Sequence, residues 1–494
     1  MKISDCAAIL QTSHRDQRVL QAQDVELTDL TQNTKEVKPG CCFVAIKGVH
    51  FDGHEHIQEV VDAGAKLVIV ERPVEFNGDA VVVTVPNTYK ALAQLSTRFF
   101  GDPSRQLTMF GVTGTNGKTT ITHLIDQIME DHGVQTGIIG TMYSKVGTKK
   151  LPAVNTTPEP LTAQRTLSEM VAANDQACAM EVSSIALVQG RAWGIDFDTV
   201  VFTNLTEDHL DYHKTFENYF DAKALLFSQL GNSYHVGEKT KSAVINIDDP
   251  HGKRLLEKTA ANILTYGAKG EGILQAKNIQ VTNKDTKFDL QIYDETYPVQ
   301  LKLMGNFNVY NALAAFGACY EQGLEPAEII TSLESVKGVR GRFQVVPNEK
   351  DVTVIVDYAH TPDGLENVLS TINAFAKQRV FCVVGCGGDR ETTKRPIMGN
   401  IAVQHSTDAV LTSDNPRTED PEKILDQVVA ELKPGTFTRM TDRRAAINFA
   451  LGEAKAGDVV LIAGKGHEDY QIIGTVKHHF DDVEVVNDFY KQEK

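Results

Sequence analysis

The chain has 494 residues, of which 41% are hydrophobic, so it is long and apolar enough to build several globular cores. Its 49 Lys and Arg against 65 Asp and Glu give a formal net charge of −16, a balance that repels polyphosphates and argues against a nucleic-acid partner. The seven cysteines include no C-x-x-C pair, which argues against a disulfide framework or a zinc site. No apolar run reaches roughly 18 residues and no signal-peptide core is present, so we expect a cytoplasmic protein without a membrane span.

Residues 1–103 are predicted to form a small mixed α/β domain. Apolar runs at 42–46, 66–70 and 80–85 predict three strands, separated by turn-forming clusters. The G-D-P-S stretch at 101–104 predicts a linker to the next domain.

Residues 104–337 are predicted to form a central domain whose parallel sheet is covered by helices on both faces. Its strands are expected at 107–112, 137–140, 178–182, 199–203 and 242–246. Their alternation with helical patterns is typical of such a sheet. Between 272 and 303, polar and apolar residues alternate with the two-residue period of half-exposed strands, which predicts a small antiparallel insertion at the edge of this domain.

Residues 338–494 are predicted to form a second doubly wound, Rossmann-like sheet, with strands at 352–356, 379–384, 408–412 and 458–463. Each strand is followed by a polar or glycine-rich loop: D-Y-A-H-T-P, G-C-G-G-D-R, S-D-N-P-R and G-K-G-H-E. Ligands of doubly wound sheets bind beyond the carboxyl ends of the strands, so these four loops predict a binding site. The acidic residues after the third loop, Glu419 and Asp420, are interpreted as solvated turn residues.

The sequence G-V-T-G-T-N-G-K-T-T at 111–120 leads from a strand into a helix and predicts a phosphate-binding loop. Gly114 and Gly117 let backbone amides turn toward phosphates at the start of a helix. Lys118 is placed to reach the β and γ phosphates, and the Thr119 hydroxyl to ligate Mg²⁺. The spacing differs from the strict P-loop pattern and no N-K-x-D guanine motif is present, so we expect ATP rather than GTP.

Lys223 lies in the middle of the apolar arc of a predicted helix at 216–230. One interpretation is that its stem is buried while its ammonium reaches water, and the helical wheel favours this. The other is that burial lowers its pKa, so that the neutral amine takes up CO₂ as a carbamate. Glu181, at the end of one strand, and His209, after the next, could hold Mg²⁺ beside the phosphate loop.

Several motifs together resemble the Mur ligases of bacterial cell-wall synthesis. They are G-V-T-G-T-N-G-K-T-T, E-V-S-S, T-N-L-T-E-D-H-L-D-Y-H, Y-F-D-A-K-A-L-L-F, G-R-F-Q and D-Y-A-H-T-P-D. N-T-T-P-E-P, G-C-G-G-D-R, D-N-P-R and G-K-G-H-E-D-Y-Q are similar to the branch that uses ATP to add a diamino acid to UDP-N-acetylmuramoyl-L-alanyl-D-glutamate. The resemblance implies three domains that bind UDP, ATP and the incoming amino acid, and it favours an N6-carboxylated lysine at Lys223.

The resemblance also implies roles for individual residues. The catalytic set would be Lys118, Glu181, His209 and Lys223, and the magnesium ligands would be Thr119, Glu181, His209 and carboxylated Lys223. ATP would be bound by Gly114, Thr115, Asn116, Gly117, Lys118, Thr119, Thr120, Asn306, Arg342, Asp357 and His360. The UDP-dipeptide would be bound by Thr34, Asn155, Thr156, Thr157, Ser183, Gln189 and Arg191, and the diamino acid by Arg390, Asp414, Asn415, Pro416, Arg417, Gly464 and Glu468.

The sequence departs from the family pattern in two places. A D-S-R triplet often seen in the first domain is Asn33, Thr34 and Lys35 here, and Thr34 keeps a hydroxyl that could reach uracil. Ile185 replaces a histidine after E-V-S-S, and we assign it no role.

The acceptor is expected to be meso-diaminopimelate, with L-lysine as the alternative. Only diaminopimelate has a second carboxylate at its distal end, where the Arg417 guanidinium would suit it, while Glu468 suits the distal amine. The expected partners are therefore the UDP-dipeptide, a diamino acid and ATP, with Mg²⁺ as cofactor and the chain acting as a monomer. The phosphate loop is also compatible with a folylpolyglutamate synthetase, with a P-loop ATPase that has no amino-acid acceptor, and with a non-catalytic binder.

Overall fold

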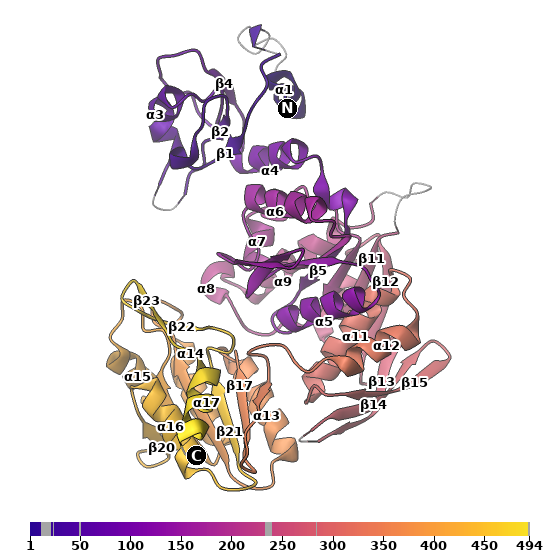
Figure 1. The fold of residues 1–494 in the computed structure, drawn as a ribbon, viewed down its shortest axis with the longest axis vertical. Helices are drawn as coiled ribbons and strands as arrows, with labels where there is room; N and C mark the ends of the chain where they lie inside the picture. Colours follow the sequence, from indigo (N-terminus) through magenta and orange to yellow (C-terminus); the bar gives the residue numbers. More distant parts are fainter. Residues whose placement is uncertain (11–20, 23, 49–50, 233–239, 283, 493–494) are drawn as a thin grey trace.

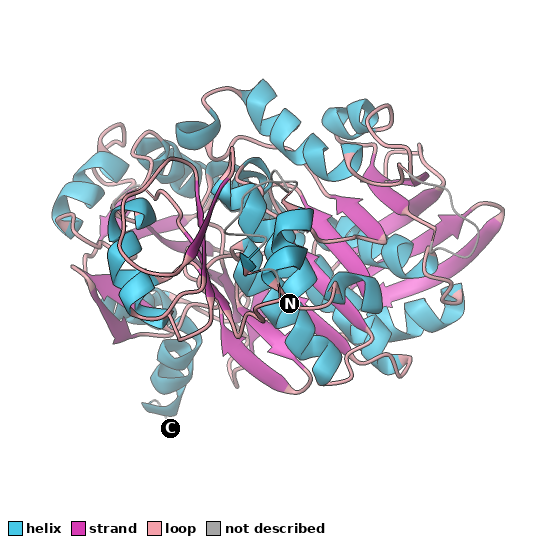
Figure 2. Cartoon of the chain, turned by 90° about the horizontal axis from the view of Figure 1, so that it is seen from above, coloured by secondary structure: helices cyan, strands magenta, loops and turns pink. Residues whose placement is uncertain are grey.

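The computed structural model describes residues 1–10, 21–22, 24–48, 51–232, 240–282 and 284–492. Three large sheets follow one another along this part of the chain, each with its own helices (Figure 1). Seen from above, helices lie on either side of the strands (Figure 2). The predicted α/β class is therefore confirmed. No helix in the described ranges is long and apolar enough to cross a membrane.

The N-terminal unit is built on a four-stranded parallel sheet in the order β1-β2-β3-β4. Its strands are β1 (Leu30–Thr31), β2 (Cys42–Val44), β3 (Leu67–Val70) and β4 (Val81–Thr84). Its helices are α1 (Ile3–Ile9), α3 (Ile57–Asp62) and α4 (Thr88–Phe99), with short helices η1 (Thr34–Glu36), η2 (Gly53–His56) and η3 (Pro103–Gln106). The three predicted strands are confirmed, whereas β1 was missed because two residues are too short to form a pattern.

The central unit is built on an eleven-stranded sheet in the order β15-β14-β13-β12-β11-β10-β5-β9-β6-β7-β8. Its strands are β5 (Thr108–Thr113), β6 (Thr136–Ile139), β7 (Tyr143–Val146), β8 (Lys149–Pro152), β9 (Ala177–Glu181), β10 (Thr199–Phe202), β11 (Ser242–Asn246), β12 (Asn262–Gly267), β13 (Leu274–Val281), β14 (Thr286–Ile292) and β15 (Glu295–Leu301). The predicted antiparallel insertion is confirmed as β13 to β15. A second antiparallel edge, β6 to β8, was not predicted.

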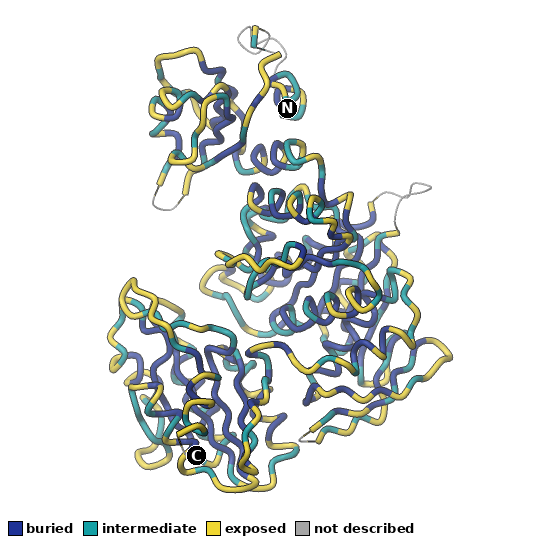
Figure 3. The backbone as a smooth tube through the Cα atoms, in the orientation of Figure 1, coloured by how far each residue is buried: buried dark blue, intermediate teal, exposed yellow. Residues whose placement is uncertain are grey.

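Helices cover both faces of this sheet and enclose two separate cores. They are α5 (Lys118–Asp131), α6 (Pro160–Ala172), α7 (Ser184–Val188), α8 (Leu210–His213), α9 (Phe216–Ser228), α10 (Pro250–Leu255), α11 (Asn306–Tyr320) and α12 (Pro326–Ser335). The backbone of the inner strands is buried along nearly its whole length (Figure 3). Since β5 lies between β9 and β10, the loop that directly follows β5 leaves the sheet near its middle.

The C-terminal unit is built on a six-stranded sheet in the order β16-β17-β21-β18-β19-β20. Its strands are β16 (Gln344–Val346), β17 (Thr353–Asp357), β18 (Val380–Cys386), β19 (Asp408–Ser413), β20 (Phe437–Arg439) and β21 (Val459–Ala463), and a hairpin pairs β22 (Tyr470–Ile473) with β23 (Val476–His479). Its helices are α13 (Pro362–Phe375), α14 (Lys394–His405), α15 (Pro421–Val429), α16 (Arg443–Glu453) and α17 (Asp482–Gln492). The four predicted strands are mutually parallel, so their following loops leave one edge of the sheet as expected.

A fully buried ion pair joins two helices of this unit. The Arg443 guanidinium on α16 donates to both carboxylate oxygens of Asp482 on α17, at 2.8 and 2.7 Å, and neither side chain is exposed. The same guanidinium donates to the Ala463 carbonyl at 3.0 Å, at the end of β21. The pair therefore also fixes the start of the G-K-G-H-E loop.

Asp482→Asn should destabilise this unit by about 3–5 kcal/mol, because it leaves a buried guanidinium without its counter-charge. Asp488→Asn is the matched control, since Asp488 pairs with Arg444 across the same two helices but both side chains are half exposed, and such pairs contribute at most about 1 kcal/mol. Native-state amide exchange of β21 measures the loss of stability in each variant. Equal losses in the two variants would contradict the prediction.

Candidate functional site

The predicted phosphate loop runs from the end of β5 into the first turn of α5. Its residues are Gly114, Thr115, Asn116, Gly117, Lys118, Thr119 and Thr120. Gly114 has a φ of 146°, and a Cβ there would lie 1.8 Å from the Thr203 hydroxyl, so a side chain cannot be accommodated. The Lys118 ammonium donates to the carbonyls of Gly114 at 2.9 Å and Thr115 at 2.8 Å. Burial lowers the pKa of Lys118.

A carboxylate lies directly beside this loop, at the end of β9. The Thr119 hydroxyl donates to Glu181 at 3.0 Å, and the Thr141 amide and hydroxyl donate to the same carboxylate at 2.8 and 3.0 Å. Arg342, from the C-terminal unit, donates to the Thr119 hydroxyl at 2.9 Å. Thr141 was not predicted, because it belongs to no motif. Its only sequence signal is its position just after β6, whose neighbour in the sheet is β9.

Lys223 is buried, with 2% of its surface exposed, and its ammonium donates to the Gly114 carbonyl at 2.9 Å. It also lies 4.5 Å from the centroid of the Tyr219 ring. The interpretation that its ammonium reaches water, which the helical wheel alone favoured, is therefore wrong: the apolar arc of α9 packs inward, and its centre lies against the phosphate loop. Burial, reinforced by the charge of Lys118, holds the pKa of Lys223 well below its usual value. A neutral amine is the form that reacts with CO₂.

His209 precedes α8 in a left-handed conformation, with a φ of 56°. Its Nε2 lies 3.4 Å from Asp208, and burial lowers its pKa. Within the described ranges, no three His, Cys, Asp or Glu side chains gather closely enough to hold a metal by themselves. The donors beside the loop, the Thr119 hydroxyl and the Glu181 carboxylate, are nevertheless hard oxygens. They fit Mg²⁺, which commonly takes its remaining ligands from phosphates and water.

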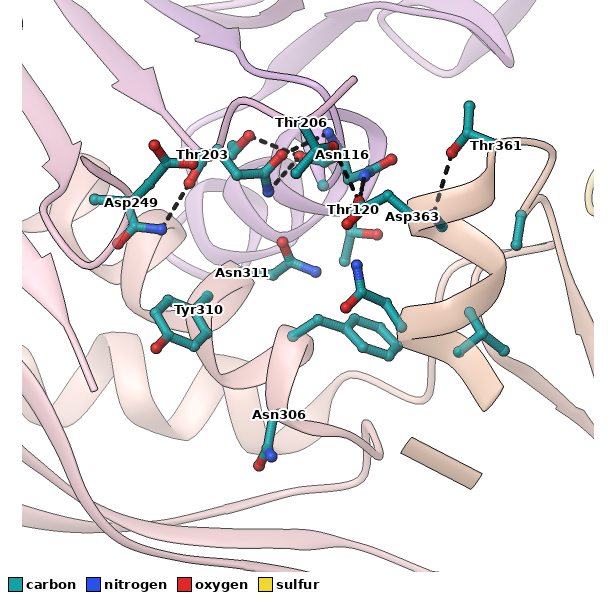
Figure 4. A pocket seen from close by; sticks show the side chains of 18 of the residues that line it. Asn116, Thr120, Thr203, Thr206, Asp249, Asn306, Tyr310, Asn311, Thr361 and Asp363 are labelled. Atoms are coloured by element: carbon teal, nitrogen blue, oxygen red, sulfur yellow. Dashed lines mark hydrogen bonds between the residues drawn. The ribbon is translucent and has the colours of Figure 1, made fainter. Parts of the chain in front are cut away.

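A cavity of about 480 Å³ lies between the central and C-terminal units (Figure 4). Its walls include the predicted ATP residues Asn116, Gly117, Thr120, Asn306, Arg342, Asp357 and His360. Residues that were not predicted also line it, among them Thr203, Asn246, Asp248, Tyr310, Asn311 and Asp363. Most of them come from strand ends and from α11 and are scattered along the chain, although Thr203 opens the T-N-L-T-E-D-H-L-D-Y-H motif and Asp363 closes D-Y-A-H-T-P-D.

Asp363, in the first turn of α13, joins the C-terminal unit to the phosphate loop. Its carboxylate accepts hydrogen bonds from the side-chain amide of Asn116 at 2.7 Å and from the Thr206 hydroxyl at 3.0 Å (Figure 4). Burial raises the pKa of Asp363, and burial also lowers the pKa of His360, on the same cavity wall, to about 4. Asp357 accepts from two backbone amides, so in this structure its carboxylate holds the shape of its own loop.

Most of the residues predicted to bind the UDP-dipeptide lie beyond the end of β9. The Thr157 hydroxyl donates to the Glu181 carbonyl at 2.8 Å and accepts from the Ser183 amide at 3.0 Å. Arg191 donates to the Thr157 carbonyl at 3.1 Å, and the Thr156 hydroxyl lies 3.0 Å from that of Thr141.

The other three predicted residues of this set are less closely associated. Asn155 is exposed, and Gln189 follows α7. Thr34 lies in η1 of the N-terminal unit, on a different sheet. The structure therefore brings together four of the seven residues predicted to bind the UDP-dipeptide.

The loops predicted to bind the diamino acid hydrogen-bond one another. Asn415 donates to Glu468 at 2.8 Å, and Gly464 has a φ of 111°, a conformation that residues with side chains rarely adopt. Lys465 donates to Glu468 at 3.0 Å and to the Asn415 side-chain oxygen at 3.1 Å, and its side chain is completely buried. Lys465 was not predicted, although it stands inside the G-K-G-H-E motif.

Arg417 links this loop to its neighbours. It has a φ of 51°, and its guanidinium donates to the Gly388 carbonyl at 2.7 Å. Its backbone pairs with the β22–β23 hairpin, and Pro416, which precedes it, packs against Gly388. Arg390 is exposed on the loop after β18.

The interpretation of Glu419 as a solvated turn residue is wrong. Both of its carboxylate oxygens accept hydrogen bonds from Arg395, whose side chain is fully buried. No local pattern indicates this pair, because its members belong to different elements. Asp420 is the N-cap of α15, and its carboxylate accepts from the Glu422 amide at 2.9 Å.

Comparisons with known proteins assign each unit to one family. The family model described as "Mur ligase middle domain" matches residues 112–319, that of the "Mur ligase, glutamate ligase domain" matches 341–466, and that of the "Mur ligase family, catalytic domain" matches 26–100.

Individual relatives match along almost the whole chain. The diaminopimelate ligase of Lactiplantibacillus plantarum, named UDP-N-acetylmuramoyl-L-alanyl-D-glutamate--2,6-diaminopimelate ligase, is 54% identical over 93% of both chains. The enzyme of the same name from Bacillus cereus is 48% identical over 95% of both. A solved structure of a ligase with this name is 31% identical, with a TM-score of 0.71, and covers 100% of this chain and 99% of its own. By these matches and by its phosphate loop, this chain belongs to the Mur ligase family of ATP-dependent ligases.

Proposed function

We propose that this chain adds meso-diaminopimelate to the D-glutamyl carboxylate of UDP-N-acetylmuramoyl-L-alanyl-D-glutamate, using ATP, in peptidoglycan precursor synthesis. The observation that carries the proposal is the contact between the C-terminal unit and the phosphate loop of the central unit. Arg342 and Asp363 of the C-terminal unit hydrogen-bond the phosphate loop. The loops of Arg417 and Glu468 leave the same sheet edge as the His360 loop that lines the cavity.

The reaction would proceed in two steps. The D-glutamyl carboxylate attacks the γ-phosphorus of ATP, giving an acyl phosphate and ADP. An amine of the diamino acid then attacks the acyl carbon to give a tetrahedral intermediate. Phosphate departs as the C–O bond breaks, the nitrogen loses a proton, and the amide product forms. Lys118 and the loop amides would stabilise the charge on the transferring oxygens, and contact between the units would keep water from the acyl phosphate.

Mg²⁺, when bound, would neutralise phosphate charge, with Thr119 and Glu181 as its nearest protein donors. His209 and a carboxylated Lys223 complete the proposed set. The neutral Lys223 amine would take up CO₂ and lose a proton, becoming an anion next to the Gly114 carbonyl and thus at the phosphate loop. The carbamate would replace a costly buried cation by an oxygen donor.

Recognition of the acceptor would depend on charge at its distal end. The Arg417 guanidinium would bind the distal carboxylate of diaminopimelate, and Glu468 the distal amine. With L-lysine, the second candidate, Arg417 would face an ammonium without an anion. Arg390, Asp414, Asn415 and Gly464 would complete this pocket.

The proposed units are residues 1–103 for UDP, 104–337 for ATP and 338–494 for the amino acid. A cytoplasmic location and action as a monomer stay predictions. Two rival activities make different demands: a folylpolyglutamate synthetase would require a folate, and a simple ATPase would release phosphate without either co-substrate. A non-catalytic binder is disfavoured by the intact set of Lys118, Glu181, His209 and Lys223.

In an assay with purified enzyme, phosphate release should require ATP, Mg²⁺, the UDP-dipeptide and a diamino acid together. Diaminopimelate should be preferred to L-lysine by about 10- to 1000-fold in kcat/KM, since each charge-assisted hydrogen bond contributes about 1.5–3 kcal/mol. Equal or better use of L-lysine would overturn the acceptor assignment. Chelation of Mg²⁺ should abolish the reaction.

Arg417→Ala should remove most of this preference by lowering kcat/KM for diaminopimelate while leaving use of L-lysine nearly unchanged. Arg444→Ala is the matched control, because Arg444 is a half-exposed arginine of the same unit that pairs with Asp488 on α17. If Arg417→Ala retains the full preference, Arg417 does not read the distal carboxylate.

Lys223 should carry a carbamate that can be observed directly. With ¹³C-labelled bicarbonate, the enzyme should give a carbamate carbon resonance that is missing from Lys223→Met, and this variant should lose at least about 100-fold in kcat, as expected when a transition-state charge stabiliser is removed. An active enzyme without the resonance under CO₂-free conditions would disprove the modification.

A further inference from the structure

A fully buried arginine on α14, Arg395, connects the loop after β19, which contains Arg417, to the loop after β18. The Nη1 and Nη2 atoms of Arg395 donate to the two carboxylate oxygens of Glu419, both at 2.8 Å. The same guanidinium donates to the Gly387 carbonyl at 3.1 Å and to the Gln427 side chain at 2.8 Å. One planar group therefore contacts the loop after β18, the loop after β19 and helix α15. Such a bidentate pair fixes orientation as well as distance.

Glu419 extends this connection to a second point on the loop after β18. Its carboxylate accepts a hydrogen bond from the Asp389 backbone amide. The Asp389 carboxylate in turn accepts from the Thr418 hydroxyl at 2.8 Å and from the Thr418 amide at 3.2 Å. The hydrogen bonds from Arg395 lower the pKa of Glu419 to about 2, so the carboxylate stays charged at any physiological pH. The two loops are thus cross-linked by an ion pair and by reciprocal hydrogen bonds.

Arg417 lies at the centre of this cross-linked region. Its guanidinium donates to the Gly388 carbonyl at 2.7 Å, and the Gly388 amide donates to the Asn415 carbonyl at 2.9 Å. Its φ of 51° is in the left-handed region, which is unfavourable for a residue with a side chain. Strained conformations of this kind persist only where the surroundings over-determine them.

The surroundings hold Arg417 from two sides. On one side the backbone of the hairpin pairs with it, through the Ile472 carbonyl at 3.0 Å and the Gly474 amide at 2.7 Å. On the other side the chain reaches Glu419 two residues later and is held there by Arg395. Release of this second attachment would loosen the loop after β18, and with it the position of the Gly388 carbonyl to which the guanidinium donates.

We propose that Glu419, held by Arg395, is a positioning residue for Arg417, and that it thereby sets the selectivity between acceptors that differ in distal charge. This inference rests on the proposed function, in which Arg417 binds the distal carboxylate. Glu419 acts through Arg417 and not by touching the acceptor. Because its charge is matched by Arg395, it can stand two residues from Arg417 without neutralising the guanidinium that the acceptor needs.

Glu419→Gln tests this inference, because it keeps the size of the side chain but removes its charge and one of the two acceptor oxygens. We expect kcat/KM for diaminopimelate to fall about 10- to 100-fold, mainly through KM, with the KM values for ATP and the UDP-dipeptide unchanged. Use of L-lysine should stay nearly constant, so the preference should shrink. In an Arg417→Ala background, Glu419→Gln should add little further loss, because the two residues act through one contact.

The chain provides a matched control three residues away. Glu422 also pairs with an arginine, Arg439, but this pair is solvent-exposed and lies on α15 and β20. Glu422→Gln should leave both acceptors unaffected. Glu419→Asp, which keeps the charge, should recover part of the preference. Arg395→Lys, which keeps a charge but removes the fork, should reduce the preference as Glu419→Gln does, and it serves as the test if Glu419→Gln does not fold.

Two outcomes would overturn the inference: a folded Glu419→Gln enzyme that keeps the full preference, or equal losses with both acceptors, which would indicate general destabilisation. Failure of the proposed function would give a different result, because the wild-type enzyme itself would then show no preference for diaminopimelate. In that case both proposals fall together.

Discussion

The site depends on one partly buried carboxylate that belongs to the C-terminal unit and accepts hydrogen bonds from the central unit. Asp363 lies in the first turn of α13 in the C-terminal unit, yet it accepts hydrogen bonds from the Asn116 side chain in the phosphate loop and from the Thr206 hydroxyl beyond β10. Partial burial makes a carboxylate without partners costly, so these donors favour contact between the units. Asp363 and Arg342 of the C-terminal unit both line the cavity, and the loops that would bind the acceptor leave the same sheet edge of that unit.

The phosphate loop is surrounded by charges that burial makes expensive. Lys118 and Lys223 both donate to the Gly114 carbonyl, and the charge of Lys118 disfavours the charged form of Lys223. Glu181 is held by the hydroxyl groups of Thr119 and Thr141 and by the Thr141 amide, all of which are neutral donors. An anionic ligand would relieve the crowding of positive charge, so the arrangement is suited to binding phosphate.

The sequence predicted those parts of the site that follow from local pattern and from sheet topology. Lys118 stands in a loop whose glycines and helix are visible in the sequence, and the parallel strands place Arg417 and Glu468 at one edge. Thr141 belongs to no motif, and the role of Asp363 was not predicted although it closes D-Y-A-H-T-P-D, because both roles arise from contacts between elements far apart in the chain. For Lys223 the helical wheel found the correct arc but could not tell which surface would cover it, and so the interpretation that its ammonium reaches water was wrong.

The left-handed backbone at Arg417 limits how acceptor recognition can change. Residues with branched side chains are strongly disfavoured at a φ of 51°, whereas glycine and asparagine are tolerated there. A new specificity at this position must therefore be compatible with the backbone before it can provide new contacts. Engineering a different acceptor would be easier at neighbouring side chains of the same proposed pocket, such as Arg390, whose backbone has no such restriction.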